Sequence, residues 1–266
     1  MTRFVKAHAC GNDFLVVEGK CDPELAKKLC ARNTGVGADG VEFLEWTGSL
    51  SGTIRLANAD GSIAEISGNG TRCVAAWMAH QANAAPGDVV TLETDAGVRA
   101  CRMVSTAESH YEIAAGMGVP VVHAEKVTLA DGTVVEGTVV SMGNPHFVIL
   151  VEGEEFQAHG RSWQALGQEI CFHLQFPQQT NVEFVRILDT KEIAIRIFER
   201  GVGPTTSSGT GTCACAATVI ARYGGAPHLL VDAPGGRQHV EWAGEGREMT
   251  LTGPADLIAT GEAFGG

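Results

Sequence analysis

The chain has no apolar run long enough to cross a membrane, and it is short of positive charge. Lys and Arg together number 19 against 31 Asp and Glu, which gives a net charge of −12 over 266 residues. That balance disfavours nucleic acid and anionic membrane surfaces as partners. Residues 1–20 carry Arg3, Lys6 and Asp13 where a secretory signal would need an apolar core. We therefore expect a cytoplasmic protein.

The eight cysteines lack the density and spacing of a disulfide scaffold. They also lack metal-ligand spacing, because Cys213 and Cys215 lie two residues apart on a predicted helix and point to different faces. His8 and His146 are isolated, each suited to a hydrogen-bonded turn or to proton handling. We expect cysteines in the core and no metal site.

One short motif occurs twice. Residues 67–71 read Ser-Gly-Asn-Gly-Thr and residues 208–212 read Ser-Gly-Thr-Gly-Thr, an offset of 141. Val-Glu-Phe at 41–43 recurs at 182–184 with the same offset, and the Gly-Asn pair that begins at residue 11 recurs at residue 143. Three matches in one order predict an internal duplication into two lobes.

Most of each lobe is predicted to be strand. Residues 53–57 and 192–197 alternate apolar and polar side chains, which is typical of half-buried strands. Residues 137–142 and 146–151 are predicted to pair around a Gly-Asn-Pro turn. Asp22 and Pro23 have the pattern of an N-cap and first helical position, predicting a short helix to about residue 30.

The segments that follow the repeated motif differ from the strands. Residues 71–81 and 212–223 are rich in alanine and lack a clear polar face, as expected of buried helices. We therefore predict an α+β fold of two pseudo-symmetric lobes, each a curved, mostly antiparallel sheet wrapped around a central helix. The predicted boundaries are 1–117, joined by a last strand at about 255–266, and 118–254.

Ser-Gly-x-Gly at a helix entrance has two interpretations. The structural one is a serine N-cap followed by glycines in a tight turn, and for an isolated motif this is the more frequent. The functional one is a carboxylate site, because the first amides and the helix dipole attract anions. Neither copy continues as a phosphate loop, and Cys73 and Ala214 stand where a dinucleotide fingerprint needs glycine.

Polar side chains precede each copy at the end of a predicted strand. Asn58 lies nine residues before Ser67, while Glu199 and Arg200 lie nine and eight before Ser208. They are suited to holding an ammonium and a carboxylate group. The structural alternatives are a plain turn at Asn58 and a surface ion pair at Glu199 and Arg200.

These segments together resemble diaminopimelate epimerase over essentially the whole chain. The matching segments are 8–14, 35–40, 58–62, 68–73, 141–146, 180–182, 199–203, 209–211 and 253–255. The resemblance implies two lobes with the substrate in a cleft, no metal or other cofactor, and a homodimer as the assembly to test. It also implies inversion of one stereocentre of LL-diaminopimelate to the meso form, in which one cysteine thiolate removes the α-proton and a second thiol returns one.

The resemblance implies roles for particular residues. The catalytic positions are those of Ser67 and Ser208. The substrate's polar groups would be held by Asn12, Asn58, Asn144, Asn181, Glu199 and Arg200. The amides offered to the carboxylate at the reacting carbon would come from Gly68, Asn69, Gly209 and Thr210.

The sequence departs from the family pattern at three positions. Serine replaces both catalytic cysteines, and Pro204 replaces a glutamate. A thiol has a pKa near ~8.5, whereas a serine hydroxyl acts as a base only with a partner that takes its proton. Three accounts stay open: an epimerase whose cysteines were replaced with binding intact, a divergent isomerase of another small acid, and a non-catalytic amino-acid binder. The retained polar positions favour family-type binding with impaired turnover.

Overall fold

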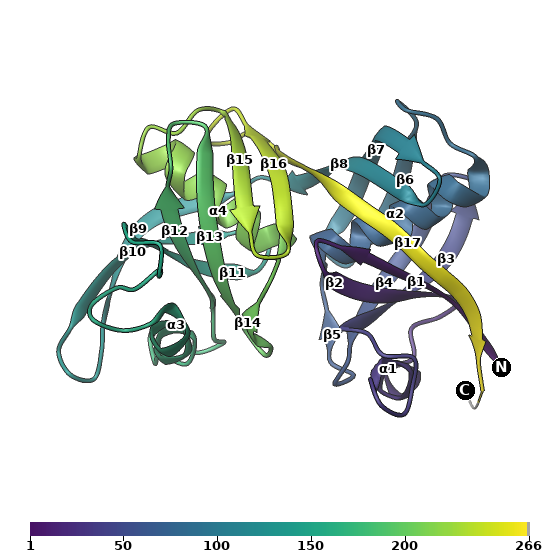
Figure 1. Cartoon of the computed structure of the whole chain (residues 1–266), viewed down its shortest axis with the longest axis horizontal. Helices are drawn as coiled ribbons and strands as arrows, with labels where there is room; N and C mark the ends of the chain where they lie inside the picture. The colour runs from purple at the N-terminus through teal and green to yellow at the C-terminus, as the bar shows by residue number, and fades with distance from the viewer. Residues whose placement is uncertain (265–266) are drawn as a thin grey trace. The chain divides into compact units, whose positions relative to one another are not determined.

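The computed structural model describes residues 1–264. The chain divides into two compact units, one formed by Met1–Gly116 with the segment from Thr252 onward, the other by Met117–Leu251. Figure 1 follows the chain through both by colour. In the described part of the chain, no helix combines the length and apolarity needed to span a membrane.

Unit 1 is a curved sheet around one helix. Its helices are α1 (Pro23–Cys30) and α2 (Gly68–Ala82). Its strands are β1 (Thr2–Ala9), β2 (Asn12–Glu18), β3 (Gly40–Gly48), β4 (Ser51–Asn58), β5 (Ile63–Ala64), β6 (Val89–Thr94), β7 (Gly97–Ala107), β8 (His110–Gly118) and β17 (Met249–Ala263). Most neighbours are antiparallel, while β2 with β3 and β4 with β6 are parallel. Strand β17 returns from the C-terminal end to pair with β1.

Unit 2 repeats this plan. Its helices are α3 (Trp163–Cys171) and α4 (Gly209–Arg222). Its strands are β9 (Val121–Thr128), β10 (Val134–Ser141), β11 (Pro145–Leu150), β12 (Asn181–Ile187), β13 (Glu192–Glu199), β14 (Gly203–Thr205), β15 (His228–Ala233) and β16 (Gly236–Trp242). The parallel pairs are β11 with β12 and β13 with β15, and the other pairings are antiparallel. The predicted α+β class and the internal duplication are confirmed.

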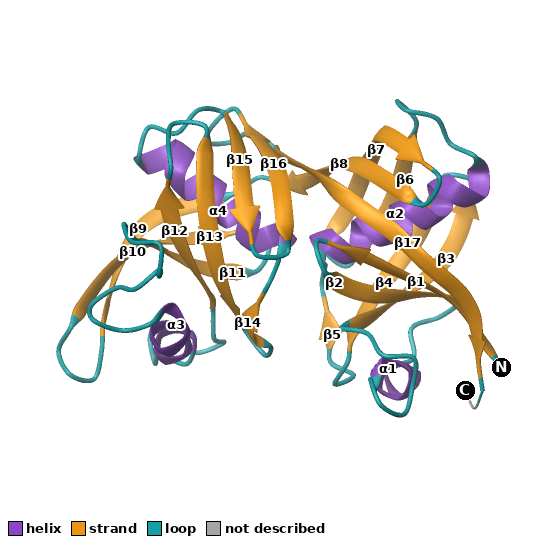
Figure 2. Ribbon diagram, viewed as in Figure 1, coloured by secondary structure: helices purple, strands orange, loops and turns teal. Residues whose placement is uncertain are grey.

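The central helices α2 and α4 are buried on nearly every side, as their alanine-rich sequences predict. Figure 2 shows each of them enclosed by the strands of its own unit. Helices α1 and α3 lie outside the sheets and bury one apolar face each. In α1 that face holds Ala26, Leu29 and Cys30 against β3 and β4. Asp22 is the N-cap of α1, as predicted, and accepts from the amides of Glu24 and Leu25.

Candidate functional site

The predicted site residues fall into two sets, one in each unit, and both are built around the start of a central helix. Ser67 is the N-cap of α2, and its Oγ accepts the Gly70 amide at 3.1 Å. Ser208 is the N-cap of α4, and its Oγ accepts the Gly211 amide at 3.3 Å. Both serines therefore cap their helices, as the structural interpretation predicted, and the carboxylate-binding interpretation stays a prediction. A cap of this type contributes about 1 kcal/mol to its helix.

In unit 1 the second helical residue is tied to the start of β2. The side-chain amide of Asn69 donates to Asn12 Oδ1 at 3.1 Å. Arg72, fully buried one turn along α2, donates from Nη2 to Asn69 Oδ1 at 2.7 Å. Asn12 in turn donates to Asp39 Oδ2 at 2.7 Å. These bonds fix the orientation of both asparagine side chains.

An ion-pair network supports Asn12 from outside. Arg32 bridges Asp13 and Asp39, with N–O distances of 2.7 Å to each, and Lys6 also binds Asp13. Although burial alone raises the pKa of Asp13, hydrogen bonds from Arg32 and Lys6 lower it to about 2. Asp13 is therefore ionised at neutral pH, and this network holds the start of β2, where Asn12 lies.

Asn58 occupies a different environment from the other predicted residues of unit 1. It ends β4, and its side-chain amide donates to Ser62 Oγ at 2.9 Å. The backbone closes the same turn, since the Asn58 amide donates to the Ser62 carbonyl. Among the described residues no hydrogen bond joins Asn58 to Ser67 or Asn12. The structure thus contains the turn that the structural alternative for this segment predicted, and the substrate-binding role of Asn58 stays a prediction.

In unit 2 a chain of hydrogen bonds reaches α4 from the interior of the sheet. His146 is fully buried, with Nδ1 2.7 Å from Glu183 Oε1 and Nε2 3.0 Å from Asn144 Oδ1. Asn144 then donates to Thr210 Oγ1 at 3.2 Å. The Asn144 to Thr210 contact repeats the Asn12 to Asn69 contact of unit 1. Each unit thus ties the second residue of its central helix to an asparagine, which is the first residue of β2 in unit 1 and directly precedes β11 in unit 2.

The remaining predicted residues of unit 2 lie where the end of β13 meets the start of β12. Asn181 Oδ1 accepts the Arg200 amide at 2.9 Å, and its side-chain amide donates to the Pro145 carbonyl at 3.1 Å. The Arg200 guanidinium donates to the Gln178 carbonyl. Glu199 is the last residue of β13. Arg200 therefore turns outward at the strand end, and Asn181 anchors its backbone.

Two buried glutamates lie behind the glycines of the repeated motif, and sequence reasoning missed their role. A Cβ on Gly70 would stand 2.0 Å from Glu42 Oε1, and one on Gly211 would stand 2.9 Å from Glu183 Oε1. Burial raises the pKa of Glu42 to about 8, so its carboxyl is protonated at neutral pH. The recurrence of Val-Glu-Phe was the available signal, because it places an acidic residue in an otherwise apolar strand.

The cysteines nearest the repeated motif are core residues, as predicted. Cys73, Cys213 and Cys215 are fully buried. Burial raises the pKa of the Cys73 and Cys215 thiols. Neither is therefore a thiolate at neutral pH. His8 takes the turn role proposed for it, accepting the Gly11 amide on Nδ1 at 3.4 Å.

Comparison with known proteins gives one consistent family. The family model described as diaminopimelate epimerase matches residues 4–122 and 138–258. A diaminopimelate epimerase of Pelotomaculum thermopropionicum is 36% identical over 280 residues, covering 97% of this chain and 98% of its own. The enzyme of that name from Desulfitobacterium hafniense is 34% identical over 278 residues, covering 97% and 96%.

Solved structures share the fold at low sequence identity. A hydroxyproline epimerase from Agrobacterium vitis, with bound trans-4-OH-L-proline, superposes with a TM-score of 0.71 at 18% identity and covers 98% of this chain and 91% of its own. A phenazine biosynthesis protein from Bacillus anthracis gives 0.71 at 14% identity and covers 98% of each chain. These likenesses concern the fold alone.

Proposed function

This chain belongs to the diaminopimelate epimerase family and is an isomerase of the epimerase type, and we propose that its substrate is diaminopimelate, interconverted between the LL and meso forms without a cofactor. The observation that carries the proposal is the repeated arrangement at Ser67 and Ser208. In both units a serine caps a buried, glycine-rich helix whose second residue is bonded to an asparagine.

The proposed reaction moves one proton off the α-carbon and one back onto it. A base at one serine position takes the α-proton, and the group at the other position donates a proton to the opposite face. In each unit the first-turn amides of the central helix and its dipole are suited to binding a carboxylate and to stabilising the charge that develops at the reacting carbon. Asn12, Asn58, Asn144, Asn181, Glu199 and Arg200 would hold the remaining polar groups.

The serines determine how fast this reaction runs. The helix dipole at Ser67 or Ser208 would stabilise a deprotonated serine by only about 1–2 kcal/mol. The pKa of a serine hydroxyl is several units above that of a thiol, and each pKa unit corresponds to about 1.36 kcal/mol. The helix dipole therefore does not make up the difference. Cys73 and Cys215 do not replace the missing thiolates, because they are buried and uncharged. We therefore propose intact binding with much reduced proton transfer.

The proposed partner is a small amino acid in the cytoplasm. The net charge of −12 argues against nucleic acid and anionic membrane as partners. Membership of this family suggests a homodimer, and sedimentation of the purified chain tests that assembly.

The experiment combines binding with isotope exchange. Calorimetry measures diaminopimelate binding, and proton NMR follows loss of the α-proton signal in deuterated buffer. We expect the parent chain to bind and exchange slowly, and the double variant Ser67→Cys/Ser208→Cys to exchange faster by orders of magnitude. Ser162→Cys is the matched control, because Ser162 is also a helix N-cap, accepting the Ala165 amide at the start of α3.

Two outcomes would contradict the proposal. If another amino acid binds and diaminopimelate does not, the substrate assignment fails. If the parent exchanges rapidly and the double cysteine variant is silent, the serines support proton transfer of their own and the account of impaired turnover is wrong.

A further inference from the structure

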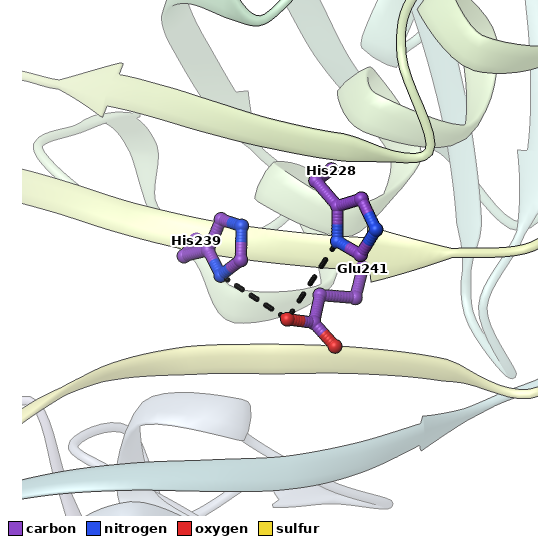
Figure 3. Close-up of side chains that lie close together, drawn as sticks. All are labelled: His228, His239 and Glu241. Atoms are coloured by element: carbon purple, nitrogen blue, oxygen red, sulfur yellow. Dashed lines mark ion pairs between the residues drawn. The ribbon is translucent and has the colours of Figure 1, made fainter.

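Three potential metal ligands lie together on the outer face of the β15–β16 hairpin in unit 2, away from the repeated motif. His228 begins β15, while His239 and Glu241 lie two residues apart on β16 and so share one face of that strand. The antiparallel register places His228 directly opposite Glu241. Figure 3 shows the three side chains converging from the two strands.

Their geometry suits a single ion. Glu241 Oε1 lies 3.7 Å from His228 Nδ1 and 3.6 Å from His239 Nδ1, as the dashed lines in Figure 3 mark. One ligand atom from each residue can be chosen so that all three lie within 4.8 Å of one another. Zinc bonds to nitrogen and oxygen are about 2.0–2.2 Å long, which places two ligands of a tetrahedral ion about 3.4 Å apart. Small side-chain rotations therefore suffice to bring these atoms onto one ion.

The backbone already fixes much of the arrangement. The two imidazole rings are stacked, with centroids 6.1 Å apart and planes at 14°. The strand neighbours Leu229 and Val240 point inward and are fully buried, which holds the outward direction of the three ligands. A site of this kind on a paired β-ladder loses less freedom on binding than one on a mobile loop.

The charges around the cluster distinguish it from an ordinary ion-pair network. Farther along the same face, Arg237 neutralises Asp232 and Glu192. In the part of the chain that the structure describes, no lysine or arginine forms an ion pair with Glu241, whose partners are the two histidines. A cation shared by all three side chains would supply the charge that this end of the ladder lacks.

We propose that His228, His239 and Glu241 form a binding site for a divalent transition-metal ion of the zinc class. Two imidazoles and one carboxylate are a donor set that zinc accepts with a water in the fourth position. The nitrogen ligands disfavour magnesium and calcium, which prefer oxygen donors. The ion would clamp β15 to β16 and stabilise the folded state, since the unfolded chain does not hold the three ligands together.

This site departs from the sequence-based expectation of no metal. His-x-Glu on β16 supplies only two ligands on one strand face, and the third comes from another strand. The hairpin register that adds His228 follows from pairing between strands, which spacing along the chain does not reveal.

The test uses the full chain, stripped with a chelator, and Zn²⁺ alone as the probe. A Cys21→Ser background removes the one cysteine of the described chain that is not buried. Calorimetry should give one Zn²⁺ per chain, and thermal unfolding should shift upward with added Zn²⁺. His239→Ala and Glu241→Gln should each weaken Zn²⁺ binding at least tenfold and abolish the thermal shift. Because these side chains face outward, we expect both variants to fold.

His110→Ala is the matched control, because His110 also pairs with a carboxylate, Asp256, on the surface of unit 1. It should bind Zn²⁺ as the parent does. Co²⁺ in place of Zn²⁺ gives a second readout, in which visible absorption of low-coordinate Co²⁺ should appear in the parent and be lost in His239→Ala. Absence of Zn²⁺ binding by the parent, or equal binding by parent and His239→Ala, would overturn the proposal. The proposed epimerase reaction is independent of either result.

Discussion

The carboxylate of Glu42 lies against the α-carbon of Gly70, so closely that a Cβ there would stand 2.0 Å from Oε1. The equivalent pair in unit 2 is Glu183 with Gly211, at 2.9 Å. The two glutamates differ in their partners. Glu183 is bonded to His146, whereas neither carboxylate oxygen of Glu42 has a hydrogen-bond partner among the described residues. The equivalent of His146 on β2 is Phe14, because both stand two residues before the valine that pairs with the glutamate.

The first prediction concerns Glu42 and pH. The pKa of Glu42 is raised by burial from a usual 4.5 to about 8. Between pH 4.5 and about pH 8 the folded state keeps a proton on Glu42 that the unfolded state releases, so the free energy of unfolding falls as pH rises. At about 1.36 kcal/mol per pKa unit, the loss by pH 8 is on the order of 5 kcal/mol. Glu42→Gln removes this ionisation and should be more stable than the parent at pH 8.

Urea unfolding at pH 4.5, 6 and 8 measures the effect. Glu45→Gln is the control, since Glu45 lies on the same strand with an exposed side chain. The control should keep the parent's pH slope, while Glu42→Gln should flatten it. Equal slopes in all three proteins would mean that Glu42 ionises normally in the folded state.

The second prediction tests the packing of glycine on glutamate. Gly70→Ala would press a methyl group into Glu42, and overpacking of this kind lowers the free energy of unfolding by about 1–3 kcal/mol. The higher helix propensity of alanine offsets up to about 1 kcal/mol of that loss. Gly211→Ala meets atoms at 2.9 Å and beyond, and should cost less. Combining Gly70→Ala with Glu42→Ala should cost less than the sum of the single changes. Urea denaturation of the parent, Gly70→Ala, Glu42→Ala and the double variant provides the double-mutant cycle. Strict additivity would show that the two residues do not touch.

The third prediction exploits the difference between the units. His146→Phe installs in unit 2 the residue that unit 1 already has, and it leaves Glu183 buried without its imidazole partner. Leaving a buried acceptor without its hydrogen-bond donor costs about 1–3 kcal/mol. Adding Glu183→Gln should recover part of that loss, because no ionisable group then remains buried without a partner. His123→Phe, an exposed change on β9, serves as the control. A destabilisation that Glu183→Gln does not relieve would point to lost packing instead of an unpaired carboxylate.

Much of the fold could be predicted from local pattern. The N-cap at Asp22, the strands around residues 53–57 and 192–197 and the buried helices α2 and α4 all follow from signals within a few residues. Helix α3, capped by Ser162, was not predicted. The parallel pairing of β2 with β3 was not predicted either, because it joins segments separated by a helix.

The features of the candidate site also divide into those set by nearby residues and those set by strand pairing. Both serine caps were accessible from sequence, since the partner of each lies three residues away. The bond from Asn69 to Asn12 and the contact of Glu183 with His146 join residues far apart in the chain. Such partners depend on strand register, so the sequence indicated which residues are polar and left their pairing open.

The last prediction concerns Arg72, which is fully buried and forms no ion pair with a carboxylate in the described part of the chain. Its Nη2 donates to Asn69 Oδ1, and its Nε donates to the Pro254 carbonyl at 3.4 Å. A buried guanidinium without a carboxylate partner carries a desolvation cost, which Arg72→Met removes together with its two hydrogen bonds. Those bonds are worth about 1 kcal/mol each and the relieved desolvation offsets them, so the free energy of unfolding should stay within about 1 kcal/mol of the parent.

Ligand binding should respond differently, because Asn69 loses the donor that orients it towards Asn12. A lost hydrogen bond is worth about 1 kcal/mol, which corresponds to about fivefold in the dissociation constant for diaminopimelate. Calorimetry measures that constant, and NMR of the Asn69 side-chain amide reports its mobility without ligand. Arg55→Met, an exposed change, should alter neither. A large loss of stability in Arg72→Met, with the Asn69 amide still ordered, would show that Arg72 supports the core of unit 1 and does not position Asn69.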